Sequence, residues 1–313
     1  MNNRLALAIV SVALLGALAG CSAAGLLSME PVDDEQLADS ASRSVENASV
    51  NPVAQGGEVA RRAIENGSTT VVADSPPVRT GLPYRHDGRL YNLSRSVLGT
   101  EPGYRTAVEI DYNASTVEGT VVDYDDLPAV DRRALAPLLD RQRRTLEPGY
   151  DFGLPATYTE SEAEASVLVT DQEVDAVRYE GEVYPVNADG PESVTLEVYR
   201  YEATPVADSP EAYAEDLKAT YAFTLSGLSD AESDVVAEAI SDTYYAEDDD
   251  DEAFASLVER FRAHDPVVSR ERTGKWVVRY DGQLYWAEMD YWGFVSETPD
   301  ASVTEPEATP PPE

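Results

Sequence analysis

Residues 279–285 read Arg-Tyr-Asp-Gly-Gln-Leu-Tyr, and two stretches upstream follow the same pattern. Residues 85–91 read Arg-His-Asp-Gly-Arg-Leu-Tyr, and residues 178–184 read Arg-Tyr-Glu-Gly-Glu-Val-Tyr. An acid followed by glycine between alternating polar and apolar residues predicts a β-hairpin, because a type I′ turn needs positive φ at both central positions. The expected turn glycines are Gly88, Gly181 and Gly282.

Helical patterns precede the second and third hairpins at the same distance. Ser229 and Glu232 have capping-box spacing and open an apolar-faced helix, and a counterpart is expected over 128–146, kinked by Pro137. Phe254, Leu257, Val258 and Phe261 have the spacing of a surface helix packed on a sheet.

These elements predict an α+β fold of antiparallel β-hairpins with amphipathic helices packed on one face. The hairpin glycines are 93 and 101 residues apart, which suggests an internal duplication. No strand–helix alternation with a glycine-rich phosphate turn is visible, so a doubly wound nucleotide-binding fold is not favoured.

The N-terminus has the order of an export signal: Arg4, an apolar stretch of about 15 residues, then Gly20 and Cys21. This stretch is shorter than the ~20 residues that a membrane span needs. Residues 18–21, Leu-Ala-Gly-Cys, resemble the lipobox of bacterial and archaeal lipoprotein families. The resemblance implies cleavage before Cys21 and its lipidation; the alternative is a core cysteine in an uncleaved helix. Cys21 is the only cysteine, so no disulfide can form within the chain.

The chain has 59 acids against 23 bases, a net charge of −36. This composition resembles that of proteins from extreme halophiles, because high salt screens self-repulsion; a mesophilic protein with an acidic disordered tail is the alternative. No nucleic-acid partner is expected, since phosphate binding needs a basic face and the chain as a whole is acidic. One local basic cluster either pairs with neighbouring acids or faces anionic lipid: Arg132, Arg133, Arg141, Arg143 and Arg144.

Composition also divides the chain, because all 26 aromatic residues lie between Tyr84 and Phe294. The expected order is a signal peptide (1–20), a lipidated flexible tether (21–56), a first α+β repeat (57–147), a second repeat with a closing hairpin (148–296) and a disordered, acidic, proline-rich tail (297–313).

Catalytic and metal-binding patterns are not evident in the sequence. His86 and His264 are the only histidines, and neither accompanies a nucleophile elbow or a zinc ligand set. The acidic run 248–252 lacks EF-hand spacing and favours a helix N-terminus instead. We therefore assign no catalytic residue, metal or cofactor.

Two kinds of surface feature remain as candidates. The C-terminal aromatic residues favour core packing, because aromatics on alternating strand positions build sheets; they are Trp276, Tyr280, Tyr285, Trp286, Tyr291 and Trp292. Tyr285 and Trp286 are adjacent, so in a strand they point to opposite faces, and the alternative is an exposed aromatic stripe on one of those faces. Candidate glycosylation sequons, meaningful for an exported chain, begin at Asn47, Asn66, Asn92 and Asn113.

The sequence thus favours a membrane-anchored, extracellular lipoprotein on the outer face of the cell membrane. It would be held by membrane lipid through Cys21 and would bind or organise an unknown extracellular protein or ligand without catalysis. A solute-binding receptor of a transporter and an extracellular carboxylate-dependent hydrolase are the alternatives.

Overall fold

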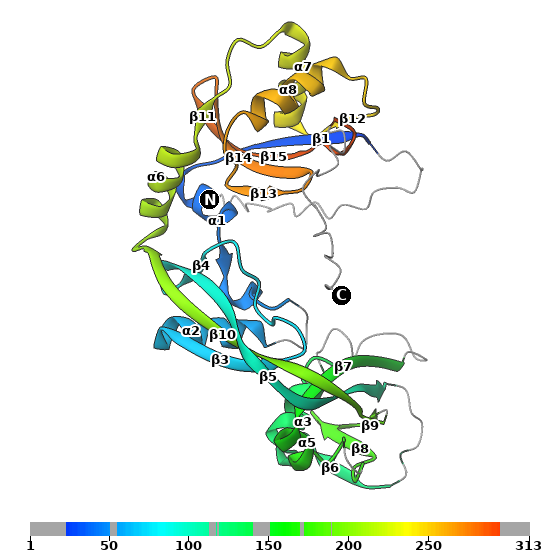
Figure 1. Ribbon diagram of the computed structural model, residues 1–313. Coiled ribbons are helices and arrows are strands. Elements are labelled where there is room, and N and C mark those ends of the chain that lie inside the picture. Colours follow the sequence, from blue (N-terminus) through cyan, green and yellow to red (C-terminus); the bar gives the residue numbers. More distant parts are fainter. Residues whose placement is uncertain are drawn as a thin grey trace, which may run out of the picture. The chain divides into compact units, whose positions relative to one another are not determined.

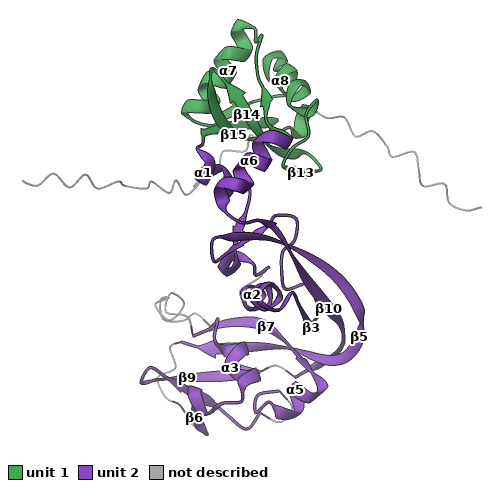
Figure 2. Cartoon of the chain, turned by 90° about the vertical axis from the view of Figure 1, so that its left-hand side faces the viewer, with its two compact units in different colours: residues 1–31, 221–313 green, residues 32–220 purple. Residues whose placement is uncertain are grey.

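The computed structural model describes residues 23–50, 55–112, 117, 119–139, 151–169, 172–188 and 190–294. The chain forms two compact units, with residues 1–31 and 221–313 in unit 1 and residues 32–220 in unit 2 (Figure 2). Both combine helices with a sheet, which confirms the α+β class. The predicted signal peptide, Cys21, Asn113 and the tail 297–313 lie outside the described residues.

Unit 1 is built on one sheet of six strands. In spatial order its main path is β11 (Phe223–Thr224), β14 (Thr273–Tyr280), β15 (Gln283–Asp290), β1 (Gly25–Pro31) and β12 (Tyr244–Ala246), and β13 (Val268–Arg270) pairs with β14.

Helices α7 (Asp230–Ser241) and α8 (Glu252–Arg262) pack on one face of this sheet (Figure 1). The four predicted apolar positions of α8 are all buried in this core, as the periodicity predicts. Leu27 and Met29 of β1 contribute to the same core. The short 3₁₀ helix η3 (Trp292–Phe294) follows β15.

Strand β1 occupies the position where a flexible tether was expected. Gly25–Pro31 lies between β15 and β12 and is antiparallel to both. A Cβ atom at Gly25 would lie only 2.4 Å from Phe254 Cε1, so the helix packs directly against this strand. Residues 22–56 have no aromatics and many Ala, Ser, Asp and Glu residues, which is typical of a spacer, but Leu27 and Met29 give β1 a buried face whose aromatic packing partners come from elsewhere in the chain.

Unit 2 is organised by the long strand β5 (Arg89–Asp111). Strand β10 (Glu192–Ala207) pairs along most of it, while β7 (Asp151–Thr159) pairs with its C-terminal half. The remaining strands are β2 (Arg43–Ser44), β3 (Ser68–Ala73), β4 (Tyr84–His86), β6 (Val121–Asp123), β8 (Ala176–Tyr179) and β9 (Glu182–Ala188). In the described part of this unit the helices are α1 (Asp34–Ser40), η1 (Val45–Asn47), α2 (Gly56–Asn66), η2 (Tyr124–Asp126), α3 (Ala129–Leu135), α5 (Glu160–Ala165) and α6 (Pro210–Tyr221).

Two hydrophobic clusters share β5. Leu93, near its start, packs with α2 and β10, whereas Val108 and Ile110, near its end, pack with α3 and β7. These clusters both belong to unit 2, so its boundary at residue 220 differs from the expected division at 147 and 148. A strand of 23 residues is long enough to serve two cores, and local patterning does not reveal that continuity.

All three hairpin turns have two central residues with positive φ. The values are 49° and 75° at Asp87 and Gly88, 49° and 86° at Glu180 and Gly181, and 47° and 80° at Asp281 and Gly282. The flanking residues pair directly, as in His86 with Arg89. The turns are therefore the two-residue kind expected from the acid–glycine pairs.

The expectation of purely antiparallel sheets is wrong, because both sheets are mixed. The parallel pairs are β11 with β14, β2 with β4 and β6 with β8. Each involves a strand of only two or three residues that is reached by a longer connection, and such short strands carry no periodic signal.

Among the described residues, none of the helices combines the length and the apolar composition of a membrane span.

Replacing Leu27 tests the placement of β1. Leu27 is fully buried in the unit 1 core, so Leu27→Ala is expected to lower the free energy of unfolding by about 2–5 kcal/mol in urea titrations followed by tryptophan fluorescence. Leu26→Ala, on the opposite face of the strand and half-buried, is the control and should cost about 1 kcal/mol or less. Equal, negligible effects would show that these residues do not belong to the sheet.

Candidate functional site

A cavity of about 200 Å³ opens in unit 2 between α2, β3, α3 and β7. It lies where the two hydrophobic clusters of this unit meet, since residues of both line it. Its apolar lining includes Val59, Val71, Val130, Ala134 and Ala156. This volume exceeds that of engineered cavities that hold benzene, about 150 Å³.

Two arginines, Arg62 of α2 and Arg133 of α3, bring positive charge to the lining, and we call this site the arginine cavity. Arg133 Nη1 donates to Glu162 Oε1 at 2.6 Å. Arg62 Nε lies 3.7 Å from Glu58 Oε1 and has no hydrogen-bond partner among the described residues. The side chains of Arg62 and Arg133 are 42% and 31% exposed, so part of each remains accessible from solvent although Arg62 Nε is buried.

The carboxylates near the cavity are already paired. Asp74, in the lining, accepts from Arg105 Nη2 at 2.8 Å. Burial alone would raise the pKa of Glu162, but hydrogen bonds from Arg133 and from the Thr159 backbone outweigh it, so the pKa is lowered. Glu162 is thus a carboxylate that fixes the position of Arg133.

Two buried polar groups lie at this site, Tyr158 in the lining of the cavity and Asp131 in α3. Asp131 is fully buried and accepts from Ser166 Oγ at 2.6 Å and from Val167 N at 2.9 Å, while burial raises its pKa. The Tyr158 hydroxyl is also buried, has no hydrogen-bond partner among the described residues, and has its pKa raised mainly by burial. The bonds to Asp131 tie α3 to the segment after α5, which holds one wall of the cavity in place.

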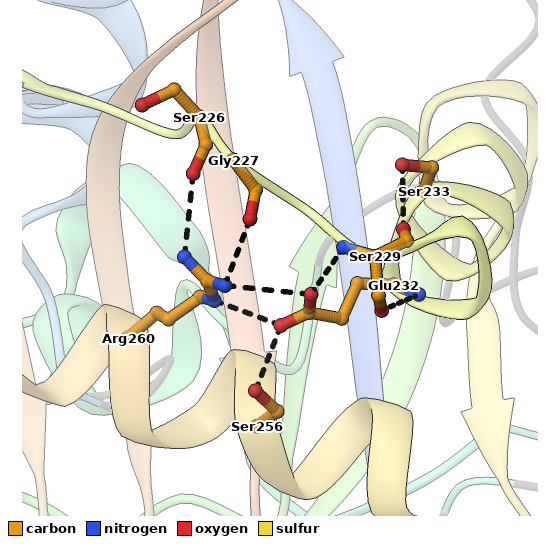
Figure 3. Close-up of polar contacts among 7 residues, drawn as sticks. All are labelled: Ser226, Gly227, Ser229, Glu232, Ser233, Ser256 and Arg260. Atoms are coloured by element: carbon orange, nitrogen blue, oxygen red, sulfur yellow. Dashed lines mark hydrogen bonds and ion pairs between the residues drawn. The ribbon is translucent and has the colours of Figure 1, made fainter.

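A polar network in unit 1 surrounds Glu232 (Figure 3). The Ser229 backbone N donates to Glu232 Oε2 at 2.6 Å, and the Glu232 backbone N donates to Ser229 Oγ at 3.2 Å, which completes the predicted capping box. From α8, Ser256 Oγ donates to Glu232 Oε1 at 2.7 Å and Arg260 Nε to the same atom at 2.8 Å. Arg260 also donates to the carbonyls of Ser226 and Gly227.

Glu232 therefore joins α7 to α8 through buried, charge-assisted hydrogen bonds. Glu232 is only 4% exposed. Hydrogen bonds from the Ser229 backbone, Ser256 and Arg260 together lower its pKa to about 2. The sequence reveals the cap within α7, but the partners from α8 are missed because their spacing in sequence carries no signal. Both carboxylate oxygens are occupied, so this network braces the helices.

The histidines and the acidic run have structural partners. The His264 ring stacks on Phe223 with centroids 4.1 Å apart, and His86 Nε2 lies 3.6 Å from Asp87 Oδ2. Asp251 caps α8 by accepting from Phe254 N at 2.9 Å. Among the described residues, no group of three or more His, Cys, Asp or Glu side chains is arranged to hold a metal ion.

Tyr285 and Trp286 pack in the core, and the alternative of an exposed aromatic stripe is contradicted at these two positions. These side chains are 8% and 3% exposed, because both faces of the sheet are covered at this point. Trp292, of the same aromatic cluster, is 56% exposed. The sequence does not tell which member of the cluster is exposed, since burial here depends on contacts outside the strand.

The other predicted surface residues are placed as follows. Asn47, Asn66 and Asn92 are exposed, at the end of η1, at the end of α2 and in β5. In the basic cluster, Arg132 donates to the backbone oxygens of Asp125 and Leu127, and Arg133 pairs with Glu162. Arg141, Arg143 and Arg144 lie outside the described residues.

Glu232 gives a pH-dependent prediction. A pKa lowered from 4.5 to about 2 on folding means that ionised Glu232 stabilises the folded state above pH 4.5, and that this contribution is lost as the pH falls towards 2. The difference in free energy of unfolding between wild type and Glu232→Gln is therefore expected to be largest above pH 5 and to shrink with acidification in urea titrations. Glu238→Gln, at an exposed position of α7, is the control. A difference that stays constant with pH would contradict this role.

In comparisons with known proteins, the chain matches no family model, no curated protein and no solved structure.

Proposed function

We propose that this protein is a membrane-anchored lipoprotein on the outer face of the cell membrane whose unit 2 binds a small carboxylate with an apolar body. The observation that carries the ligand class is the arginine cavity, where Arg62 and Arg133 border an apolar lining. The lipobox-like residues ending at Cys21 support the anchor.

The chemistry of the lining explains this choice of ligand. Arg62 Nε is buried and lacks a hydrogen-bond partner among the described residues, its ion-pair contact with Glu58 is long, and the side chain as a whole is 42% exposed. A guanidinium binds a carboxylate through two parallel N–H donors, so such a ligand would satisfy Arg62. An apolar ligand body would bury the valine and alanine side chains of the lining.

The net charge of the chain is opposite in sign to the two arginines of the cavity. A chain with a net charge of −36 repels anions over most of its surface, so a site that presents two arginines is a local exception. The same composition supports an environment of high salt, where this repulsion is screened within about 3 Å at 1 M. Close contact with a guanidinium would still select a carboxylate there.

The recurrence of the hairpin supports a further proposal, that the chain arose by internal duplication. Three acid–glycine turns share one backbone geometry and are each followed by a tyrosine two residues after the strand begins. The strands of the three hairpins pair with different neighbouring strands, so the support for a duplication comes from the turns and their spacing.

The anchor is tested by the intact mass of the protein purified from its own membrane. The expected mass is that of a chain beginning at Cys21 with a lipid adduct, and Cys21→Ser should lose the adduct and the membrane association. An unmodified mass that still includes residues 1–20 would overturn the anchor.

Calorimetric titration with benzoate tests the cavity, with benzylamine as the ligand of opposite charge. We expect benzoate to bind to wild type with a Kd on the order of 1 mM and benzylamine not to bind. Arg62→Gln should weaken benzoate binding about tenfold or more, because a hydrogen bond to a charged group contributes about 1.5–3 kcal/mol.

Arg61→Gln is the matched control for that titration. Arg61 neighbours Arg62 on α2 and forms the equivalent i,i+4 pair with Glu65, but it does not line the cavity. Its replacement should leave benzoate binding unchanged. Equal effects of the two substitutions, or equal binding of benzoate and benzylamine, would contradict the proposed ligand class.

A further inference from the structure

The start of β1 connects the proposed anchor directly to unit 1. Ala24 N donates to Ala246 O and Gly293 N donates to Ala24 O, both at 2.8 Å, so Ala24 is fixed to β12 on one side and to η3 on the other. Only three residue steps separate Cys21 from Ala24. Even a fully extended chain covers about 11 Å over that distance. A lipid on Cys21 would therefore hold this end of the sheet at the headgroups.

An exposed tryptophan lies beside that point. Trp292 precedes Gly293, whose backbone bonds to Ala24, and it is 56% exposed. The guanidinium of Arg272 lies over the Trp292 ring, 5.2 Å from its centroid. Tryptophan favours the boundary between water and hydrocarbon, because its ring is apolar and its N–H can still reach a polar partner.

Further arginines lie on the same side. A hollow of about 480 Å³ next to Arg272 is lined by Arg262, Arg270, Glu271 and Tyr291, among others. Arg262 stacks over Tyr291 at 5.6 Å, and the Tyr291 backbone N donates to Arg272 O at 3.0 Å, which links the hollow to η3. Residues 262–272 contain three arginines against two acids, Asp265 and Glu271, in a chain that is strongly acidic elsewhere.

The opposite side of Ala24 has the reverse charge. Strand β12 presents the exposed Tyr245 and leads into six consecutive acids at 247–252. Anionic headgroups would repel these carboxylates and attract the arginines. The charge difference across Ala24 therefore selects the side with Trp292 for contact.

We propose that Trp292, together with Arg262, Arg270 and Arg272, forms a membrane-contact surface of unit 1 that inserts Trp292 into the headgroup layer. This inference rests on the proposed lipid anchor at Cys21. Its occupant is the lipid surface to which the chain is attached, because the short connection brings that surface within reach of Trp292.

The chain from Cys21 to Glu313 allows a direct test, since its single cysteine can be coupled to a maleimide lipid in vesicles. Trp276 and Trp286 are 1% and 3% exposed, so Trp292 reports selectively on added quenchers. On phosphatidylglycerol vesicles, iodide should quench the coupled protein at least twofold less than the free protein, and brominated acyl chains should quench its emission. Trp292→Phe should abolish both differences.

Charge is tested by the double variant Arg270→Gln and Arg272→Gln. It should reduce quenching by brominated phosphatidylglycerol at least twofold, and wild type should be quenched less on phosphatidylcholine vesicles. Arg279→Gln is the control, because Arg279 is exposed at the other end of β14. The quenching measurements are made at the salt concentration at which the folded state is most stable.

Three results would overturn the contact surface. One is equal iodide quenching of free and coupled protein without quenching by brominated lipid. Another is equal loss of quenching in the Arg279 control and the double variant. The third is shielding of Trp292 that grows with protein density on the vesicle, which would indicate contact between copies. Coupling supplies the anchor chemically, so these results leave the mass measurement on Cys21 as the separate test of the natural anchor.

Discussion

The pairing of β1 between β15 and β12 is the constraint on which unit 1 depends. Residues 25–31 pair with strands more than 200 positions later in the chain, so this sheet forms only when segments far apart in sequence come together. Leu27 and Met29 then complete the core beneath α7 and α8. The closure also fixes Ala24, and it thereby turns the expected flexible tether into a connection of a few residues between Cys21 and a folded unit.

Unit 2 uses one long strand in a comparable way. Strand β5 joins two hydrophobic clusters, and the arginine cavity lies where their surrounding helices approach each other. Junctions between packed elements are common positions for ligand sites, because each side is rigid and the space between them is left unfilled. The ion pair with Glu162 and the buried bonds to Asp131 hold the α3 side of this junction in a defined position.

Charge has two different roles in this molecule. Most carboxylates lie on the surface, where they set solubility and long-range repulsion and contribute little to the fold. Glu232 is the opposite case: it is buried, fully hydrogen-bonded and paired with Arg260, so removing one partner would leave an uncompensated charge. The arginines at the cavity and beside Trp292 are exceptions on this acidic surface, and for that reason they carry the two proposals for binding.

Features that depend on local interactions could be predicted from the sequence. The turns at Gly88, Gly181 and Gly282, the cap at Ser229 and the buried face of α8 all depend on residues within a few positions of each other, so their patterns are visible in the chain. Other features depend on tertiary contacts and could not be predicted: the pairing of β1, the parallel strand pairs, the burial of Trp286, the exposure of Trp292 and the presence of Arg62 and Arg133 in one cavity lining. Each of these depends on partners distant in sequence, and a strand of a few residues or a single side chain carries no record of which distant surface will cover it.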